Sequence, residues 1–552
     1  MHSVMVQPPP VASTAAIRLG AAAAASCRRR IHLDHDPDAD RAAMLPPDPA
    51  GGLIRTEIAG HRAAVLRRVA IPGALLSQSL TASNRIATVD VLVPDGAGYV
   101  PILIKGHRTL DAGDGATVSL LTDPLAAVRS STQRVRPHNE DALALAHCYR
   151  LLQELGMASA NAVGGIIGRG NANDDVICWY DLASTVNGPS ILQDYDTRLT
   201  DRLEVATSAA RRDLPLAWPS RVSECRRCPW NGVCTVELTL RRDVSLIAPG
   251  SDAASLRSVG VATVDDLAAA DDAQLSAVAI SRMTGVARGP ELRDRARAWQ
   301  QDVVLVRRNE RVRVPRADIE LDVDMECYID DGAYLWGTQL SGNAAGLAAA
   351  AAAGFDPGYQ PFVTWAPLPD PAEGAIFAEF WAYLRELQLV ANEVGLTFAA
   401  YCYSRQAEER WLFSTPARYP DVPGMPSTAE VRAFTGSSSW VDMYEMVNRE
   451  FLAAGSKRLK TVAPVAGFHW RDPEPDGANS MVWYRGAVGA NGGPPSERLK
   501  TRLLQYNEDD VLATLALRQW MTDRAADDTP TVAQLAQRMR PAAASMPAAA
   551  VA

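Results

Sequence analysis

Hydrophobic and acidic residues alternate without interruption between Asp318 and Cys327. The two sets are Ile319, Leu321, Val323, Met325 and Cys327 on one side, and Asp318, Glu320, Asp322, Asp324 and Glu326 on the other. A period of two predicts a β-strand with one buried face and one acidic face. Carboxylates two residues apart repel one another unless arginine side chains or a bound cation offset their charge. Asp330-Asp331-Gly332 then predicts a hairpin turn, and residues 333–337 the returning strand.

A helical period of hydrophobic residues follows near the end of the chain. Its apolar positions are Leu499, Leu503, Ala513, Leu517 and Trp520. Tyr506 and Asp510 fall in the same register, and an aspartate on a core-facing stripe is costly unless it is paired or binds a metal ion. The alternative is that Asp510 reaches solvent, or caps a helix interrupted at Asn507. Tyr506, one turn earlier, could orient an attacking water or accept its proton.

The pattern of periods divides the chain into five segments. Residues 1–26 and 526–552, rich in Ala and Pro, predict disordered ends. Residues 27–240 mix strand-like and helical periods, residues 241–305 are helical, and residues 306–525 are again mixed. The clearest runs of the first block are strands at 86–93 and 99–105 and a helix at 141–155. The expected fold class is therefore a multi-domain α/β protein with a small helical linker.

Composition narrows the classes of function. The 552 residues are 47% hydrophobic and 22% charged, which is ordinary for globular domains. Lys and Arg number 55 against 64 Asp and Glu, and the net charge of −9 argues against a protein that coats nucleic acid through bulk charge. No run of about 18 apolar residues occurs, so we expect no membrane span. The few cysteines and the absence of a secretory signal favour the cytoplasm.

Three of the eight cysteines stand close together, as Cys225, Cys228 and Cys234 in a C-x2-C-x5-C spacing. Thiolates at that spacing can bind one metal centre, but a fourth ligand must come from elsewhere. Cys27 is a candidate, because its arginine-rich surroundings do not suit a buried apolar cysteine. Four thiolates leave no open position, so the site would be structural, and the spacing alone does not separate an iron–sulfur cluster from zinc.

One distant N-terminal cysteine plus this spacing, on either side of an α/β block, resembles the four-cysteine RecB-like nucleases. The resemblance implies a PD-(D/E)XK domain whose ends are joined by a 4Fe–4S cluster on Cys27, Cys225, Cys228 and Cys234, with zinc as the alternative. A PD-(D/E)XK site binds Mg²⁺ through an Asp at a strand end and an acid two positions before a Lys.

Asp90 and Lys105 occupy two of these nuclease positions, but Leu103 stands at the acidic one. Loss of a hard oxygen ligand lowers metal affinity. We therefore expect a degenerate nuclease domain that binds or positions nucleic acid, although His61, His107 or another carboxylate could restore the site.

The last block shows a second resemblance. Asp324-x-Glu326 on a first strand, with Tyr506-x-x-x-Asp510 on a late helix, resembles the DEDD exonucleases of the RNase H-like fold, in their tyrosine variant. The phrases at 456–460, 467–470 and 506–514, with Ser480, are similar to the RNase H-like domain fused behind RecB-like nucleases in bacteria. The resemblance implies a further metal-binding acid, for which Glu408 and Asp442 are the candidates.

The resemblance to DEDD exonucleases predicts a metal-dependent 3′-to-5′ exonuclease that acts on single-stranded DNA or RNA. Two Mg²⁺ or Mn²⁺ ions would activate water and stabilise the leaving oxygen. Nucleic acid would be gripped locally by one of two basic sets, which are Arg307, Arg308, Arg311 and Arg313, or Lys457, Arg458 and Lys460.

Other interpretations stay open. The protein could be a non-catalytic nucleic-acid-binding adaptor, or a redox sensor that uses its cluster. Residues 256–263 resemble a helix-hairpin-helix, or form a plain linker with a glycine cap. No Gly-x-x-x-x-Gly-Lys-Ser/Thr loop occurs, so a helicase partner would be a separate chain.

Overall fold

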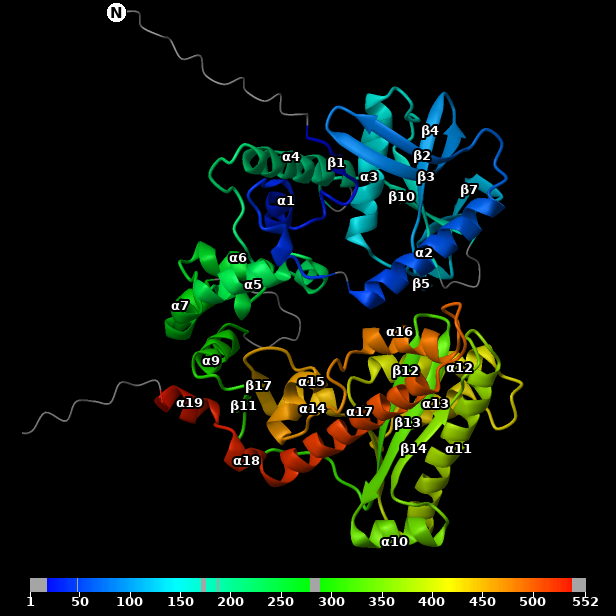
Figure 1. Ribbon diagram of the computed structural model, residues 1–552, viewed down its shortest axis with the longest axis vertical. Helices are drawn as coiled ribbons and strands as arrows, with labels where there is room; N and C mark the ends of the chain where they lie inside the picture. Colours follow the sequence, from blue (N-terminus) through cyan, green and yellow to red (C-terminus); the bar gives the residue numbers. More distant parts are fainter. Residues whose placement is uncertain (1–16, 47, 170–174, 186–187, 278–287, 539–552) are drawn as a thin grey trace, which may run out of the picture. The chain divides into compact units, whose positions relative to one another are not determined.

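The computed structural model describes residues 17–46, 48–169, 175–185, 188–277 and 288–538 (Figure 1). It forms two compact units, Met1–Leu238 and Thr239–Ala552. Each unit is a mixture of helices and strands, so the expectation of a multi-domain α/β protein is confirmed at that level.

The first unit is built on a sheet in the order β1-β3-β4-β9-β10-β6-β7, with β2 also paired to β3. Its strands are β1 (Leu19–Gly20), β2 (Leu75–Ala82), β3 (Arg85–Asp95), β4 (Gly98–Ile104), β6 (Thr117–Leu120), β7 (Asp123–Arg129), β9 (Val163–Ile167) and β10 (Val176–Asp181). A small second sheet pairs β5 (Leu110–Ala112) with β8 (Gln133–Val135). Strands β3 and β4 contain the two runs expected from the sequence.

Helices α1 (Arg28–His35), α2 (Pro49–Arg68), α3 (Asn139–Glu154) and α4 (Ile191–Ala210) contribute apolar residues to the cores that contain this sheet. Helix α5 (Asn231–Leu240) packs beside α1 and the loop of Cys228. Helix α3, expected at 141–155, places Leu145 and Leu152 in the core, and α4 begins at a capping box between Ser190 and Gln193. The buried faces of α3 and α4 therefore hold one side of the first unit together.

The N-terminal lead is not disordered where it is described. Leu19 pairs in parallel with Arg85, and Ala23 and Ala24 are buried in the core of the first unit. The prediction of a disordered segment up to residue 26 is therefore wrong for residues 17–26, because small alanines fit closely against the core. Residues 1–16 lie outside the described residues.

The second unit opens with a helical bundle, as expected for residues 241–305. Its helices are α6 (Ser251–Ser258), α7 (Val264–Ala269), α8 (Asp272–Ser276) and α9 (Arg288–Gln300). Gly260 adopts a positive φ of 82° between α6 and α7, and Thr263 forms a capping box with Asp266. The resemblance of this turn to a helix-hairpin-helix stays a prediction.

The main sheet of the second unit has the order β14-β13-β12-β15-β16. Its strands are β12 (Ile319–Tyr328), β13 (Gly332–Gly342), β14 (Gly358–Val363), β15 (Phe398–Cys402) and β16 (Trp440–Asp442). The first three are antiparallel, whereas β15 and β16 run parallel to β12. The expected acidic strand is thus β12, at the centre of the sheet, and the hairpin follows it.

Each face of β12 is covered. Its apolar residues, Leu321 and Val323 among them, pack against α11 (Ala372–Glu393). Helix α17 (Glu497–Asp523) contacts β12 and β13 and carries the residues that bond to the acidic face. The other helices are α10 (Ala344–Ala352), α12 (Gln406–Arg418), α13 (Thr428–Thr435), α14 (Met443–Glu450), α15 (Leu459–Val462) and α16 (Gly477–Ala487). None of the described helices has an apolar stretch able to cross a bilayer.

The chain after α17 is also ordered where it is described. Helices α18 (Ala525–Asp528) and α19 (Val532–Arg538) follow, and Leu535 is buried beside β11 (Leu305–Arg307), which pairs with β17 (Phe451–Ala453). The expected disordered tail is therefore wrong for residues 526–538, and residues 539–552 lie outside the described part.

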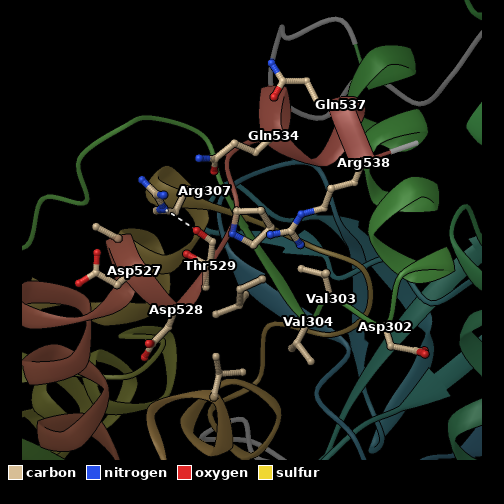
Figure 2. Close-up of a pocket in the computed structure, with 14 residues that line it drawn as sticks. Asp302, Val303, Val304, Arg307, Asp527, Asp528, Thr529, Gln534, Gln537 and Arg538 are labelled. Carbon is tan, nitrogen blue, oxygen red and sulfur yellow. Dashed lines mark hydrogen bonds between the residues drawn. The ribbon is translucent and has the colours of Figure 1, made fainter. Parts of the chain in front are cut away.

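A polar cavity of about 520 Å³ lies beside these last helices (Figure 2). It is lined from β11, α18 and α19 and contains none of the predicted catalytic residues.

Candidate metal centre

Three predicted acids from distant parts of the chain meet in the second unit. Asp324 and Glu326 lie on β12 and Asp510 lies on α17. Each offers a carboxylate oxygen, and the three oxygens lie within 4.8 Å of one another. Oxygen ligands so close together suit a hard divalent cation such as Mg²⁺ or Mn²⁺.

Helix α17 brings Asp510 to the strand because it is continuous. It runs for 27 residues from the cap at Ser496, so the alternative of a helix interrupted at Asn507 is wrong. The indole N–H of Trp470 donates to Oδ1 of Asp510 at 2.7 Å. Burial of this aspartate on the inner face of the helix is therefore matched by a specific partner.

Burial and mutual repulsion disfavour the ionised form of these acids. The pKa of Asp324 lies well above its ordinary value, first because of burial and then because of the charges of Asp510 and Glu326. The same causes, burial and then Asp510, raise the pKa of Glu326 to about 8. Burial also raises the pKa of Asp510, although Lys460 and Trp470 oppose the shift. Carboxylates in this state need a cation to ionise together, so the residues fit a bound metal.

Glu408 is the more suitable of the two candidates for a further acid. It lies in the first turn of α12, is 3% exposed, and its Oε2 has no hydrogen-bond partner. Burial raises its pKa to about 8, with added repulsion from Asp442 and Glu326, and its charge also raises the pKa of Asp324. A buried carboxylate oxygen without a partner is costly, which favours a ligand role.

Asp442 has another task in the structure. Its carboxylate accepts from the backbone N–H groups of Tyr444 at 2.8 Å and Ser404 at 3.0 Å, and from Glu445 and Arg405 at 3.4 and 3.2 Å. It therefore caps α14 and holds the loop after β15. These bonds occupy its oxygens, so we leave Asp442 out of the metal centre.

Asn507, which the sequence did not single out as a positioning group, holds the carboxylate of Asp324, and Tyr359 and Gly337 determine where Asn507 lies. The Asn507 side chain donates to Oδ2 of Asp324 at 2.8 Å and accepts from the Tyr359 hydroxyl at 2.8 Å. Gly337 on β13 makes this possible, since a Cβ there would lie 1.6 Å from Oδ1 of Asn507.

Glu326 is held from α16, where the Ser480 hydroxyl donates to its Oε2 at 2.6 Å. In the sequence, the signal for a close approach at this site was Gly337, a glycine inside a strand pattern.

Tyr506 lies beside Asp510 and is 2% exposed. Lys460 on α15 donates to its hydroxyl oxygen at 2.5 Å. Burial, followed by the charges of Asp510 and Glu326, raises the pKa of Tyr506 well above its ordinary value. The phenol is therefore protonated near neutral pH and suits orienting a water by hydrogen bonding better than accepting its proton.

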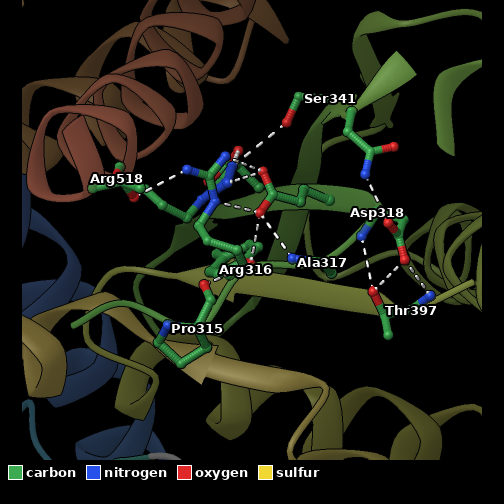
Figure 3. Close-up of polar contacts among 12 residues, drawn as sticks. Pro315, Arg316, Ala317, Asp318, Ser341, Thr397 and Arg518 are labelled. Atoms are coloured by element: carbon green, nitrogen blue, oxygen red, sulfur yellow. Dashed lines mark hydrogen bonds and ion pairs between the residues drawn. The ribbon is translucent and has the colours of Figure 1, made fainter. Parts of the chain in front are cut away.

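Two other acids of the β12 face, Glu320 and Asp322, are neutralised by arginine (Figure 3). Arg518 of α17 is fully buried and donates to Glu320 and to Asp322, each at 2.5 Å. Arg316 adds a bond of 2.7 Å to Glu320, and Asp318 accepts from Thr397. The acidic face thus has two halves, one paired with arginine and one gathered around the metal centre.

Two of the predicted basic residues are engaged elsewhere in the fold. Arg307 is buried and donates to the backbone oxygens of Thr529 and Glu310, so the prediction that it grips nucleic acid is wrong. Lys457 donates to the backbone oxygen of Phe451. In the part of the chain that the structure describes, Lys460 is the cation paired with an acid of the metal centre, with its Nζ 3.6 Å from Oδ2 of Asp510.

The predicted nuclease residues of the first unit are paired internally. Asp90 forms an ion pair with Arg62 and accepts from the Ile104 N–H at 2.7 Å. Lys105 lies 3.3 Å from Asp141 of α3, not against Asp90.

Two neighbours complete this arrangement. His107 bonds to the other oxygen of Asp141 at 2.7 Å, and Leu103 is buried in the core. Internal cations, rather than a group of acids, therefore surround the expected nuclease position.

The four predicted cysteines line one small cavity in the first unit. Cys27 precedes α1, Cys225 and Cys228 lie around a short 3₁₀ turn, and Cys234 lies on α5. All four are free thiols. Burial raises the pKa of the Cys234 thiol to about 11, with added repulsion from the other three. Segments almost 200 residues apart thus bring soft ligands together, and the donor set fits a structural metal.

Comparison with known proteins identifies one region of the chain. The family model described as the RNase H superfamily matches residues 417–522. The matched segment includes Tyr506 and Asp510, whereas Asp324 and Glu326 precede it. No curated protein and no solved structure matches the chain. The second unit therefore contains an RNase H-like domain, and an RNase H-like domain is consistent with nuclease-type activity on nucleic acid.

Proposed function

We propose that this protein is a metal-dependent nuclease whose active centre lies in residues 306–525. The observation that carries the proposal is the meeting of Asp324, Glu326 and Asp510 within 4.8 Å in the unit that contains the RNase H match. Glu408 is the proposed fourth acid of a DEDD-type site. Its charge raises the pKa of Asp324, and its buried Oε2 has no hydrogen-bond partner. The proposed activity is 3′-to-5′ exonuclease cleavage of single-stranded DNA or RNA.

Bound Mg²⁺ or Mn²⁺ would polarise the phosphodiester and lower the pKa of a water. The protein's own residues prepare the centre for this chemistry. Asn507 and Ser480 fix the carboxylates of Asp324 and Glu326, so that little reorganisation is needed on binding. The protonated Tyr506 lies where its hydroxyl can orient a nucleophile near Asp510.

We propose that residues 27–240 form a RecB-like domain that binds or positions nucleic acid without cutting it. The support is the buried Leu103 at the acidic position and the pairing of Asp90 and Asp141 with internal cations. The helical segment 241–305 would add a helix-hairpin-helix contact, and unwinding would need a separate helicase chain. The rival proposal is a non-catalytic nucleic-acid-binding adaptor, in which neither unit cleaves. The internal pairing of Asp90 and Asp141 supports the absence of cleavage in the first unit.

We propose a 4Fe–4S cluster on Cys27, Cys225, Cys228 and Cys234, which the reduced cytoplasm would preserve. The support is the meeting of these four thiols at one small cavity, with three in the C-x2-C-x5-C spacing and one far away in the sequence. Zinc on the same four thiols is the alternative, and the iron content and visible absorption of the purified protein separate the two.

The test is cleavage of labelled oligonucleotides by the full chain with Mg²⁺ or Mn²⁺. We expect the Asp324→Asn/Asp510→Asn variant to lose both cleavage and calorimetric metal binding, because it removes two ligands. Asp318→Asn is the matched control, since it removes a charge from the same strand face outside the centre. A wild-type chain that neither binds the metal nor cleaves would reject the nuclease proposal in favour of the adaptor. Metal binding and cleavage that survive in the double variant would reject Asp324 and Asp510 as the metal ligands.

A labelled 3′ or 5′ end tests the polarity of cleavage. Shortening from the 3′ end by single nucleotides is the expected pattern, whereas internal cuts would replace the exonuclease proposal by an endonuclease. Asp90→Asn should leave cleavage unchanged, and loss of cleavage would place chemistry in the first unit.

A further inference from the structure

Lys460 holds a position at the metal centre that ion pairing alone does not explain. It lies on α15, a helix of four residues, and reaches α17 with its ammonium. The contact to Oδ2 of Asp510 is 3.6 Å, which is longer than a hydrogen bond. Trp470 bonds to the other oxygen of the same carboxylate at 2.7 Å, so Asp510 is held without the lysine.

The ammonium of Lys460 has donors to spare. A lysine carries three N–H donors. Among the described residues its hydrogen-bond partner is the hydroxyl of Tyr506, at 2.5 Å. The ammonium also faces Oδ2 of Asp510 at 3.6 Å, and the side chain is 32% exposed, so an N–H group can still reach a ligand that enters from solvent.

Aromatic rings as well as acids surround this ammonium. Its Nζ lies 4.6 Å from the ring centroid of Tyr506 and 5.8 Å from that of Trp470. Such rings favour a cation without fixing its direction, since they lack the directional acceptors of a carboxylate. The flexible four-carbon stem of lysine can then redirect the ammonium at little cost.

We propose that Lys460 binds a non-bridging oxygen of the phosphodiester that is to be cleaved, exchanging its contact with Tyr506 and Asp510 for the phosphate. This role rests on the proposed nuclease function and names one anionic group of the substrate that this centre recognises. The acids of the centre repel a phosphate, and the ammonium supplies an attractive charge at the same place. The hydroxyl of Tyr506, released from the lysine, becomes available to the nucleophile.

The test measures how binding depends on salt, which is a readout separate from activity. The full chain is titrated against a fluorescent single-stranded oligonucleotide in Ca²⁺, and the intact length of the strand is checked afterwards. Each phosphate contact on a single strand contributes about 0.7 to the slope of log K against log salt concentration. We expect Lys460→Gln to reduce the slope by about that amount and to weaken binding most at low salt.

Two variants make the result specific. Lys460→Arg keeps the charge and should keep the slope. Lys500→Gln, which removes a lysine paired with Glu497 on α17, should leave the slope unchanged. If Lys460→Gln does not fold, Lys460→Met, which keeps the apolar stem, is measured instead.

The outcomes separate the two proposals. A slope that is unchanged in a folded Lys460→Gln variant overturns the phosphate role, even if cleavage is slower. A wild-type protein that neither binds nor cleaves the oligonucleotide overturns the proposed function itself.

Discussion

Substitution of Gly337 by alanine tests whether the metal centre depends on the bond between Asn507 and Asp324. The added methyl group would lie 1.6 Å from Oδ1 of Asn507 and 3.1 Å from the ring of Tyr359, so the amide must move. Both 2.8 Å bonds of that amide would then be lost. The substitution would act on the position of the Asp324 carboxylate, because neither Gly337 nor Asn507 is a proposed metal ligand.

The magnitude follows from the bond that is lost. A hydrogen bond to a charged group contributes about 1.5–3 kcal/mol. Loss of a partner that orients a metal ligand typically costs about 10–100-fold in metal affinity. We therefore expect Gly337→Ala to weaken Mg²⁺ binding by about 10–100-fold, which equals about 1.4–2.8 kcal/mol.

The assay is isothermal titration of Mg²⁺ into the full chain, alongside the Mg²⁺ dependence of cleavage. Asn507→Ala should give a similar loss, since it removes the same donor. Gly455→Ala is the matched control, because a Cβ at Gly455 meets nothing within 4 Å. Wild-type metal affinity in a folded Gly337→Ala variant would refute the idea that Asn507 positions Asp324.

Three further predictions concern buried charge and the cysteines. Arg518→Met should lower the free energy of unfolding by about 3–5 kcal/mol in a urea titration, because it leaves the buried Asp322 without its arginine and removes one of the two arginines that pair with Glu320. A loss below about 1 kcal/mol would contradict the pairing. The pKa values of Glu326 and Glu408 are both raised to about 8. Between about pH 4.5 and 8 the folded metal-free protein then holds protons that the unfolded chain has lost, so its stability should fall as pH rises through this window. Mg²⁺ affinity should rise over the same window, because the metal displaces these protons. Calorimetry at pH 6 and 8 would show equal affinities if the acids were already ionised. Cys228→Ser should reduce bound iron and visible absorption in the purified protein, whereas Cys148→Ala, outside the cavity, should not, and equal iron in both would reject the cluster.

The strand and the helix of the metal centre were predictable because their periods are local. The alternation around Asp324 gave β12 and its acidic face, and the apolar register gave the inward position of Asp510. The division of the acidic face was not predictable. Arg518 is a charged residue that a pattern places at the surface, and its burial depends on how α17 crosses β12.

The choice between Glu408 and Asp442 shows the same limit. Glu408 comes shortly after β15 and Asp442 is the last residue of β16, and the difference lies in which backbone N–H groups face them in the folded chain. The alanine-rich residues 17–26 misled for another reason, since low complexity resembles disorder but small side chains also suit close packing.

The position of Asp510 has a consequence for biosynthesis. Its partner Asp324 is translated 186 residues earlier, and the oxygens meet only after α17 has formed and docked on β12. A chain still emerging from the ribosome therefore lacks a complete cation site until its last long helix is free to fold. In the proposed nuclease, metal binding would therefore be delayed until the chain is nearly complete.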